Sequence, residues 1–133
     1  MTNTRTILSW ILQITVAIIL LQTLYFKFTA HPDSVHIFSA LGIEPWGRIG
    51  LGIVELITAA LILFPKTKII GMLSSLGIIV GAVFSHLLVL GVNVGNDGGG
   101  LFTLAIIVLL SSTLFLIIHK NETLSQIKKM IKF

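Results

Sequence analysis

The chain has 133 residues, of which 55% are hydrophobic and only 11% are charged. Because soluble domains carry about 25% charged residues, this composition excludes an ordinary soluble fold. The formal charge of +4 is spread over helix ends and one tail, which excludes the basic stripe of a nucleic-acid-binding protein, and the absence of cysteine excludes disulfides and iron–sulfur ligation by the chain's own residues.

A first membrane span is predicted over about residues 7–26, where a long apolar run follows Arg5. The run has about 20 residues, which is the length that a helix needs to cross the hydrocarbon core. It lacks a small-x-small cleavage site, so we expect a retained span and not a signal peptide. The aromatic and basic residues at 25–28 close the span and are typical of an interfacial anchor.

A short amphipathic surface helix is predicted over about residues 33–42. Pro32 and Asp33 are typical of a helix start and Gly42 of a helix end. Three apolar residues fall on one face of this helix: Val35, Phe38 and Leu41. We therefore expect it to lie on the membrane surface or to dip into it.

Three further spans are predicted over about residues 47–64, 69–92 and 101–118, followed by a basic amphipathic tail over residues 119–133. Four spans leave only short connections, so we expect a single transmembrane domain over residues 1–133. The predicted fold class is an all-α integral membrane four-helix bundle with a short amphipathic helix between the first and second spans.

The positive charges predict the orientation of this bundle, because cytoplasmic loops hold the excess of lysine and arginine. Seven of the nine cations fall on one side: Arg5, Lys66, Lys68, Lys120, Lys128, Lys129 and Lys132. We therefore expect both termini to be cytoplasmic.

Small residues recur every four positions in the third span, at Gly77, Gly81 and Ser85. Such spacing lets helix backbones approach closely. It is compatible with packing inside the bundle and also with a contact to another membrane protein.

Ionisable side chains inside the predicted spans are the candidates for a functional site. A charge at the centre of a membrane costs roughly 2.5–3.5 kcal/mol on insertion scales, so each one needs a partner or a function. Glu55 lies about 13 Å below the outer interface and His86 about 9 Å below it, as counted along ideal helices. Arg48 and Glu55 share the inward face of the second span. The predicted site collects polar side chains of this outer half: Gln22, Lys27, Glu44, Arg48, Glu55, His86 and Asp97.

Two interpretations of this set remain open. In the first, it is a buried network that pins the helices, with Glu55 protonated or paired with Arg48 or His86. In the second, it is a small outer pocket that binds a head group, a quinone or another small molecule, or that passes a proton. A metal site from Glu55, His86 and His31 has suitable ligand types but no characteristic spacing, so no metal is assigned. No serine or threonine has the sequence context of a nucleophile.

Several segments of the chain resemble the DoxX-like family of bacterial membrane proteins. The resemblance runs from the first span to the fourth, and the Glu-Pro-Trp-Gly-Arg run is its most specific part. The segments that carry it are residues 26–28, 34–38, 41–50, 55–57, 85–87 and 97–99. It implies a bundle in the bacterial inner membrane, with Lys27, Arg48, Glu55, His86 and Asp97 at polar positions of the family. Many relatives have a glycine three residues before the lysine, where this chain has Leu24.

The resemblance also implies a range of functions. Relatives are described as membrane subunits of oxidoreductase systems, including thiosulfate:quinone oxidoreductase, as accessory proteins in methylamine use and, more distantly, as assembly chaperones for membrane receptors. We expect an accessory subunit of a membrane redox assembly that binds a quinone or lipid, has no cofactor of its own and is not an autonomous enzyme. The alternatives are an assembly partner that docks through Gly77 and Gly81 on another membrane protein or a second copy, and a small carrier or proton pathway.

Overall fold

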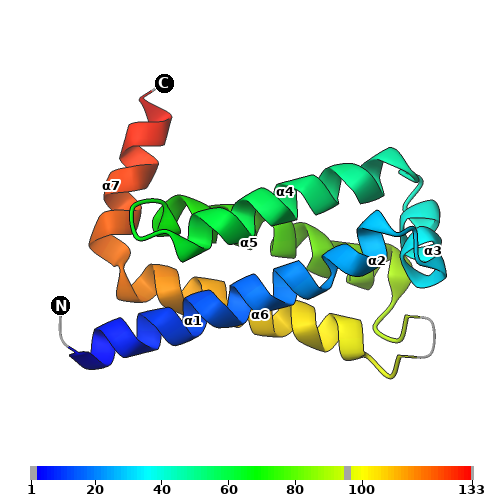
Figure 1. Cartoon of the computed structure of the whole chain (residues 1–133), viewed down its shortest axis with the longest axis horizontal. Helices are drawn as coiled ribbons and strands as arrows, with labels where there is room; N and C mark the ends of the chain where they lie inside the picture. Colours follow the sequence, from blue (N-terminus) through cyan, green and yellow to red (C-terminus); the bar gives the residue numbers. More distant parts are fainter. Residues whose placement is uncertain (1–2, 95–96, 133) are drawn as a thin grey trace.

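The computed structural model describes residues 3–94 and 97–132, and every regular element within these ranges is helical. Four long helices lie side by side along the molecule (Figure 1). They are α1 (Asn3–Gln22), α4 (Trp46–Leu63), α5 (Lys68–Ser85) and α6 (Gly100–Ile118). The shorter elements are α2 (Leu24–Phe28), α3 (Pro32–Ala40), the π-helix η1 (His86–Leu90) and α7 (Lys120–Ile131).

The core of the bundle is apolar and receives side chains from all four long helices. Helices α1 and α5 each pack against both α4 and α6, so the four helices close into a ring. Five side chains at its centre are fully buried: Val16, Ile62, Met72, Val108 and Phe115. The hydroxyls of Ser75 and Ser112 lie 3.0 Å apart and join α5 to α6 inside this core.

The outer surface of the bundle is also apolar. Ile18, Ile57 and Leu110 are each more than half exposed, and a face of this kind is stable only in hydrocarbon. Four helical segments are long and apolar enough to cross a membrane: Asn3–Phe28, Trp46–Leu63, Lys68–Leu90 and Gly100–Ile118. The all-α membrane bundle predicted from the sequence is therefore confirmed, and its outer surface contacts the lipid bilayer.

Two of the spans contain an irregular turn. The first span was expected as one helix, but it is divided at Thr23 between α1 and α2. The third span ends in η1, where the N–H of Gly91 donates to the carbonyl of His86 five residues earlier, at 2.7 Å. Gly91 ends this span because its φ of +76° lies in the left-handed region that favours glycine.

The surface helix α3 connects α2 to α4. The N–H groups of Gly42 and Ile43 donate to the carbonyls of Ser39 and Phe38, each at 3.0 Å. With Gly42 at a φ of +77°, this is the usual glycine-terminated helix end. Phe38 is buried, so α3 is anchored to the end of the bundle through an apolar side chain.

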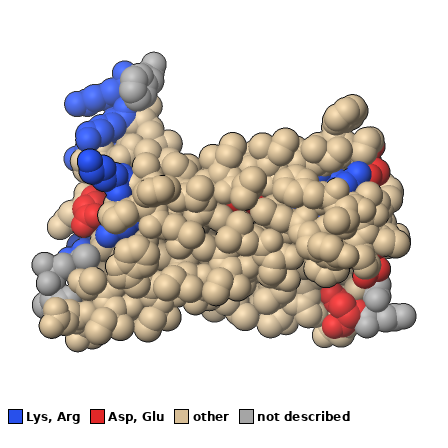
Figure 2. Space-filling view, viewed as in Figure 1, with Lys and Arg blue, Asp and Glu red and all other residues tan. Residues whose placement is uncertain are grey.

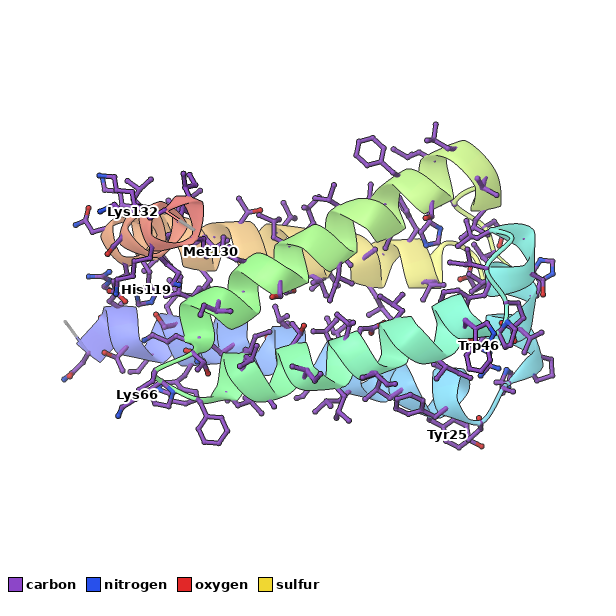
Figure 3. The ribbon with its side chains drawn as sticks, turned by 90° about the horizontal axis from the view of Figure 1, so that it is seen from above. Tyr25, Trp46, Lys66, His119, Met130 and Lys132 are labelled. Carbon is purple, nitrogen blue, oxygen red and sulfur yellow. The ribbon has the colours of Figure 1, made fainter. Side chains whose placement is uncertain are left out.

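The two ends of the bundle differ. We call the end with α2, α3 and the η1–α6 connection the α3 end, and the end with the start of α1, the α4–α5 turn and α7 the α7 end. Tyr25 and Trp46 lie at the α3 end (Figure 3), and both are largely exposed, as is typical of aromatic residues at the head-group level. At the opposite end, α7 stands across the long axis of the bundle (Figure 1).

Candidate functional site

A buried ion pair forms the centre of the polar residues at the α3 end. The ammonium of Lys27 lies 3.0 Å from Oε1 of Glu55, and the two side chains are 12% and 4% exposed. The Thr23 hydroxyl lies 2.9 Å from Oε2 of Glu55 and 2.8 Å from the carbonyl of Leu20, and its single proton serves one acceptor at a time. Glu55 therefore has a partner for each carboxylate oxygen.

The partner of Glu55 differs from the one expected. The sequence favoured Arg48 or His86, but Lys27 occupies this place because α2 packs against α4 and carries the lysine over the carboxylate. Arg48 is directed away from Glu55: its Nε donates to the carboxylate of Glu44 at 2.9 and 3.1 Å, and its Nη1 donates to the carbonyl of Lys27. Arg48 thereby links α4 to α2 at a position two helical turns before Glu55.

An aromatic ring of α2 packs against α4 close to the ion pair. A Cβ at Gly52 would lie 2.7 Å from the ring of Phe28, so the glycine lets this ring pack directly against the α4 backbone. Gly52 lies three residues before Glu55 on the same helix face. Helix α2 therefore supplies both the cation of the site, Lys27, and an aromatic contact to α4 one helical turn from Glu55.

His86 and Asp97 stabilise the η1–α6 connection and do not contact Glu55. Nδ1 of His86 donates to the carbonyl of Gly91 at 2.9 Å, and its ring packs edge-on against Phe102 with centroids 5.3 Å apart. The carboxylate of Asp97 accepts from the N–H groups of Val94, Gly99 and Leu101 at 2.8–3.1 Å. These bonds, that of Leu101 first, lower the pKa of Asp97 below its ordinary value.

The other expected members of the site contribute less. Gln22 is exposed on the last turn of α1 and so lies outside the ion-pair network. Among the described residues, no group of three His, Asp or Glu side chains is arranged to hold a metal ion. The site at the α3 end thus consists of Thr23, Lys27, Glu44, Arg48 and Glu55, with His86 and Asp97 in the neighbouring connection.

A second buried polar cluster, at the α7 end, was not predicted from the sequence. His119 is fully buried between α6 and α7, with Nε2 2.7 Å from the Ser9 hydroxyl and Nδ1 3.3 Å from Oε1 of Glu122. The guanidinium of Arg5 lies 3.9 Å from Glu122 and donates to the carbonyl of Ile118 at 2.7 Å. Burial lowers the pKa of His119, although the hydrogen bond to Glu122 opposes the shift.

The order of groups in this cluster is that of a serine, histidine and carboxylate triad. Because a carboxylate only accepts, the neutral ring of His119 donates from Nδ1, and its Nε2 accepts the Ser9 proton. However, Ser9 is 1% exposed and His119 is 0% exposed, so no substrate can reach the hydroxyl. The cluster joins α1 to the α6–α7 corner and is structural.

A sequence signal for this cluster existed. Arg5, Ser9 and Gln13 follow one another at steps of four and therefore share one face of α1. The amide of Gln13 is buried and donates to the carbonyl of Ile62 at 2.8 Å. Polar residues at helical spacing within an apolar span predict an inward face.

These features define a class: a four-span membrane protein whose interior charges are paired. Residues 11–113 match the model of the DoxX-like family, and the chain belongs to that family. The matched region contains the whole site at the α3 end, whereas His119 and α7 lie beyond it. Comparisons with curated proteins and with solved structures give no match.

Proposed function

We propose that this protein is an accessory subunit of a membrane redox assembly and that it holds the oxygen-rich head group of a quinone or lipid at the α3 end. The observation that carries the proposal is the ion pair of Lys27 and Glu55, buried under α2 within a membrane span. A charge pair at this depth is costly, and ionisable groups kept inside a membrane commonly mark a ligand or proton site.

The donors of the site fit such a ligand. The Lys27 ammonium and the Thr23 hydroxyl are hydrogen-bond donors, which suit the carbonyl oxygens of a quinone or the phosphate oxygens of a lipid. Glu55 now accepts from the ammonium and shares the Thr23 hydroxyl with the carbonyl of Leu20, and a ligand oxygen that competes for the same donors would replace it. Some relatives in the DoxX-like family are described as membrane subunits of oxidoreductase systems, which supports the redox assembly.

The backbone near the site also supports the proposal. The interruption at Thr23 and the π-helix η1 both lie toward the α3 end. Irregular backbone at membrane depth is tolerated where it is buried in protein or lines a cavity, and π-bulges occur frequently at functional sites. In this role the groups of the ion pair act as donors and acceptors for ligand binding.

The test is to purify the protein in nanodiscs and to measure copurified quinone and lipid by mass spectrometry. The informative variant is the double substitution Lys27→Met with Glu55→Leu, since an apolar pair of similar volume can replace a buried ion pair with little loss of stability. We expect this variant to stay folded and to lose the ligand. The matched control, Asp33→Asn, removes an exposed carboxylate of α3 outside the ion pair and should retain it.

Two outcomes would contradict the proposal. One is an unchanged amount of quinone and lipid on the folded double variant. The other is a wild-type protein that carries neither ligand when it is isolated from membranes that contain both. Thermal unfolding of each variant separates loss of the ligand from loss of the fold.

A second candidate function, an assembly partner, is favoured by the surface of α5. A Cβ at Gly77 or Gly81 would meet no atom within 4 Å, so neither glycine serves packing inside the described bundle. Both are exposed toward the surrounding membrane, together with Phe84. Small residues on an outward face let a helix of another protein approach closely.

Crosslinking tests this second candidate, because the chain has no cysteine of its own. Phe84→Cys places a thiol on this face of α5, and Leu110→Cys places one on α6 as the control. A maleimide–benzophenone attached to each thiol in native membranes should, on illumination, give an adduct with the first variant only, because its benzophenone inserts into C–H bonds of any neighbouring helix. The adduct should disappear when Gly77→Ile is added, and equal crosslinking from both thiols would contradict the idea.

A further inference from the structure

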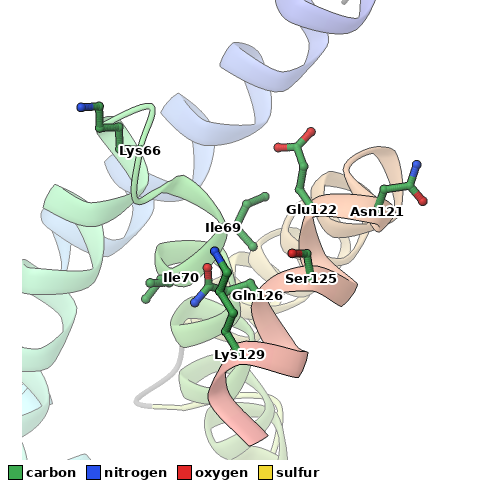
Figure 4. A pocket seen from close by; sticks show the side chains of 8 residues that line it. All are labelled: Lys66, Ile69, Ile70, Asn121, Glu122, Ser125, Gln126 and Lys129. Atoms are coloured by element: carbon green, nitrogen blue, oxygen red, sulfur yellow. The ribbon is translucent and has the colours of Figure 1, made fainter. Parts of the chain in front are cut away.

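We propose that the α7 end carries a binding site for the phosphate group of an anionic phospholipid, in the groove between α7 and the α4–α5 turn. This site is separate from the ligand site proposed at the α3 end. The groove has a volume of about 370 Å³ (Figure 4). It lies where the spans end, at the level of lipid head groups.

The lining of the groove is amphipathic. The α4–α5 turn supplies Lys66, and the start of α5 supplies Ile69 and Ile70. Helix α7 supplies Ser125, Gln126 and Lys129 from the opposite side. Figure 4 shows Lys129 extending from α7 toward α5. The Lys129 ammonium with neighbouring hydroxyl and amide donors matches a phosphate, and the isoleucines match the first carbons of a lipid chain. The exposed Lys66 side chain points away from α7 in Figure 4 and reaches the same phosphate by rotation of its side chain.

The carboxylate of the groove does not cancel these cations. Glu122 also lines the groove. Its Oε1, however, is held by His119 at 3.3 Å and lies 3.9 Å from the Arg5 guanidinium. The charge of Glu122 is therefore matched by Arg5, while Lys129 and the exposed Lys66 remain as the cations of the lining that a ligand can recruit.

The distribution of charge favours an anionic ligand at this end. Lys and Arg side chains gather along α7, at one end of the molecule (Figure 2). Seven cations and one carboxylate give the α7 end a formal charge of +6, and two cations with four carboxylates give the rest of the chain −2, which together make the +4 of the chain. Basic segments at a membrane boundary attract anionic lipid.

The position of α7 favours a lipid over a soluble anion. The helix stands across the bundle at the ends of the spans, so it lies along the membrane plane (Figure 1). Its exposed apolar side chains, Leu124, Met130 and Ile131, can enter the acyl-chain boundary while its lysines stay at the head groups. A lipid enters the groove from this same layer.

The experiment compares two double substitutions of equal charge. Lys66→Gln with Lys129→Gln removes the cations of the groove, whereas Lys128→Gln with Lys132→Gln removes one cation of α7 and the cation that follows it, both outside the lining. Each protein is reconstituted in nanodiscs of phosphatidylcholine and phosphatidylglycerol, and the retained phosphatidylglycerol is measured by native mass spectrometry. We expect about a tenfold loss for the groove pair and less than about a twofold loss for the control pair.

A third variant, Ser125→Trp, fills the groove without changing its charge and should also lose the lipid. Equal losses from both lysine pairs would overturn the site in favour of diffuse attraction to the leaflet. Displacement of the lipid by millimolar inorganic phosphate would overturn the choice of a phospholipid. Retention by Ser125→Trp would overturn the groove as the location.

Discussion

At the scale of single residues, the ion pair of Lys27 and Glu55 has the clearest energetic consequence. Each charge is stable in its buried position only because the other is 3.0 Å away. Removing one partner leaves an uncompensated buried charge, while removing both leaves none. The two kinds of substitution should therefore differ strongly in stability.

We predict that Glu55→Leu alone lowers the free energy of unfolding by about 3–5 kcal/mol, and that Lys27→Met with Glu55→Leu lowers it by less than about 1 kcal/mol. The measurement is denaturant or thermal unfolding in the same detergent, arranged as a double-mutant cycle. Additive losses from the two single substitutions would show that the side chains do not interact.

His119 gives a second prediction, on pH. Its pKa is lowered in the folded state, chiefly by burial, with Glu122 opposing the shift and Lys68 and Arg5 adding to it. The unfolded chain therefore takes up a proton near the ordinary histidine pKa of about 6.5, while the folded chain does not. The stability that this group contributes is present above that pH and is lost as the pH falls below it.

The expected observation is a lower unfolding temperature at pH 5.5 than at pH 7.5. His119→Gln should flatten this dependence. His36→Gln, which changes an exposed histidine of α3, should leave it unchanged. A dependence that persists in His119→Gln and disappears in His36→Gln would assign the proton to the other end of the bundle.

At the scale of elements, hydropathy and spacing predicted the class and order of the helices. Apolar length marks a span, and Gly42, Trp46 and Gly91 lie at helix ends in the structure. The interruption at Thr23 was not predicted, because Thr23 and Leu24 are both compatible with a continuous helix. Helix α2, which follows the interruption at Thr23, packs against α4.

The sequence predicted which residues lie near one another in the candidate site better than it predicted which of them form ion pairs. Depth and helix face bring Lys27, Arg48 and Glu55 to one end of the bundle, and all three are at that end. The cation that pairs with Glu55 is decided by the length and conformation of the lysine and arginine side chains and by the angle of α2. The helical periodicity of the sequence gives no information on either. The burial of His119 was not predicted, because this residue lies at the junction of the fourth span and the tail. At that position the distance from the membrane interface does not indicate whether a side chain is buried.

Close approach of α4 and α5 gives a third prediction. A Cβ at Gly71 would lie 2.6 Å from the backbone nitrogen of Ile62, which cannot move without shifting α4. We expect Gly71→Ala to lower the free energy of unfolding by about 1–3 kcal/mol. Gly77→Ala on the same helix meets nothing within 4 Å and should change it by less than about 0.5 kcal/mol. Equal effects of the two substitutions would show that α4 and α5 lie farther apart.

At the scale of the whole molecule, the unequal charge of the two ends gives a prediction about orientation. The excess of cations at the α7 end predicts that this end faces the cytoplasm. Single cysteines test it: His36→Cys on α3 should react with a membrane-impermeant maleimide in intact cells, and Ser125→Cys on α7 should react only after the membrane is opened. The reverse pattern would invert the proposed orientation.

The neutrality of the buried pair also has an electrical consequence. Moving one elementary charge through 100 mV involves about 2.3 kcal/mol, which is how voltage sensors with unmatched arginines are driven. In this bundle the positive and negative groups are 3.0 Å apart and are carried by helices that pack together. The transmembrane field therefore exerts almost no net force on them, and the resting conformation should be the same in an energised and a de-energised cell.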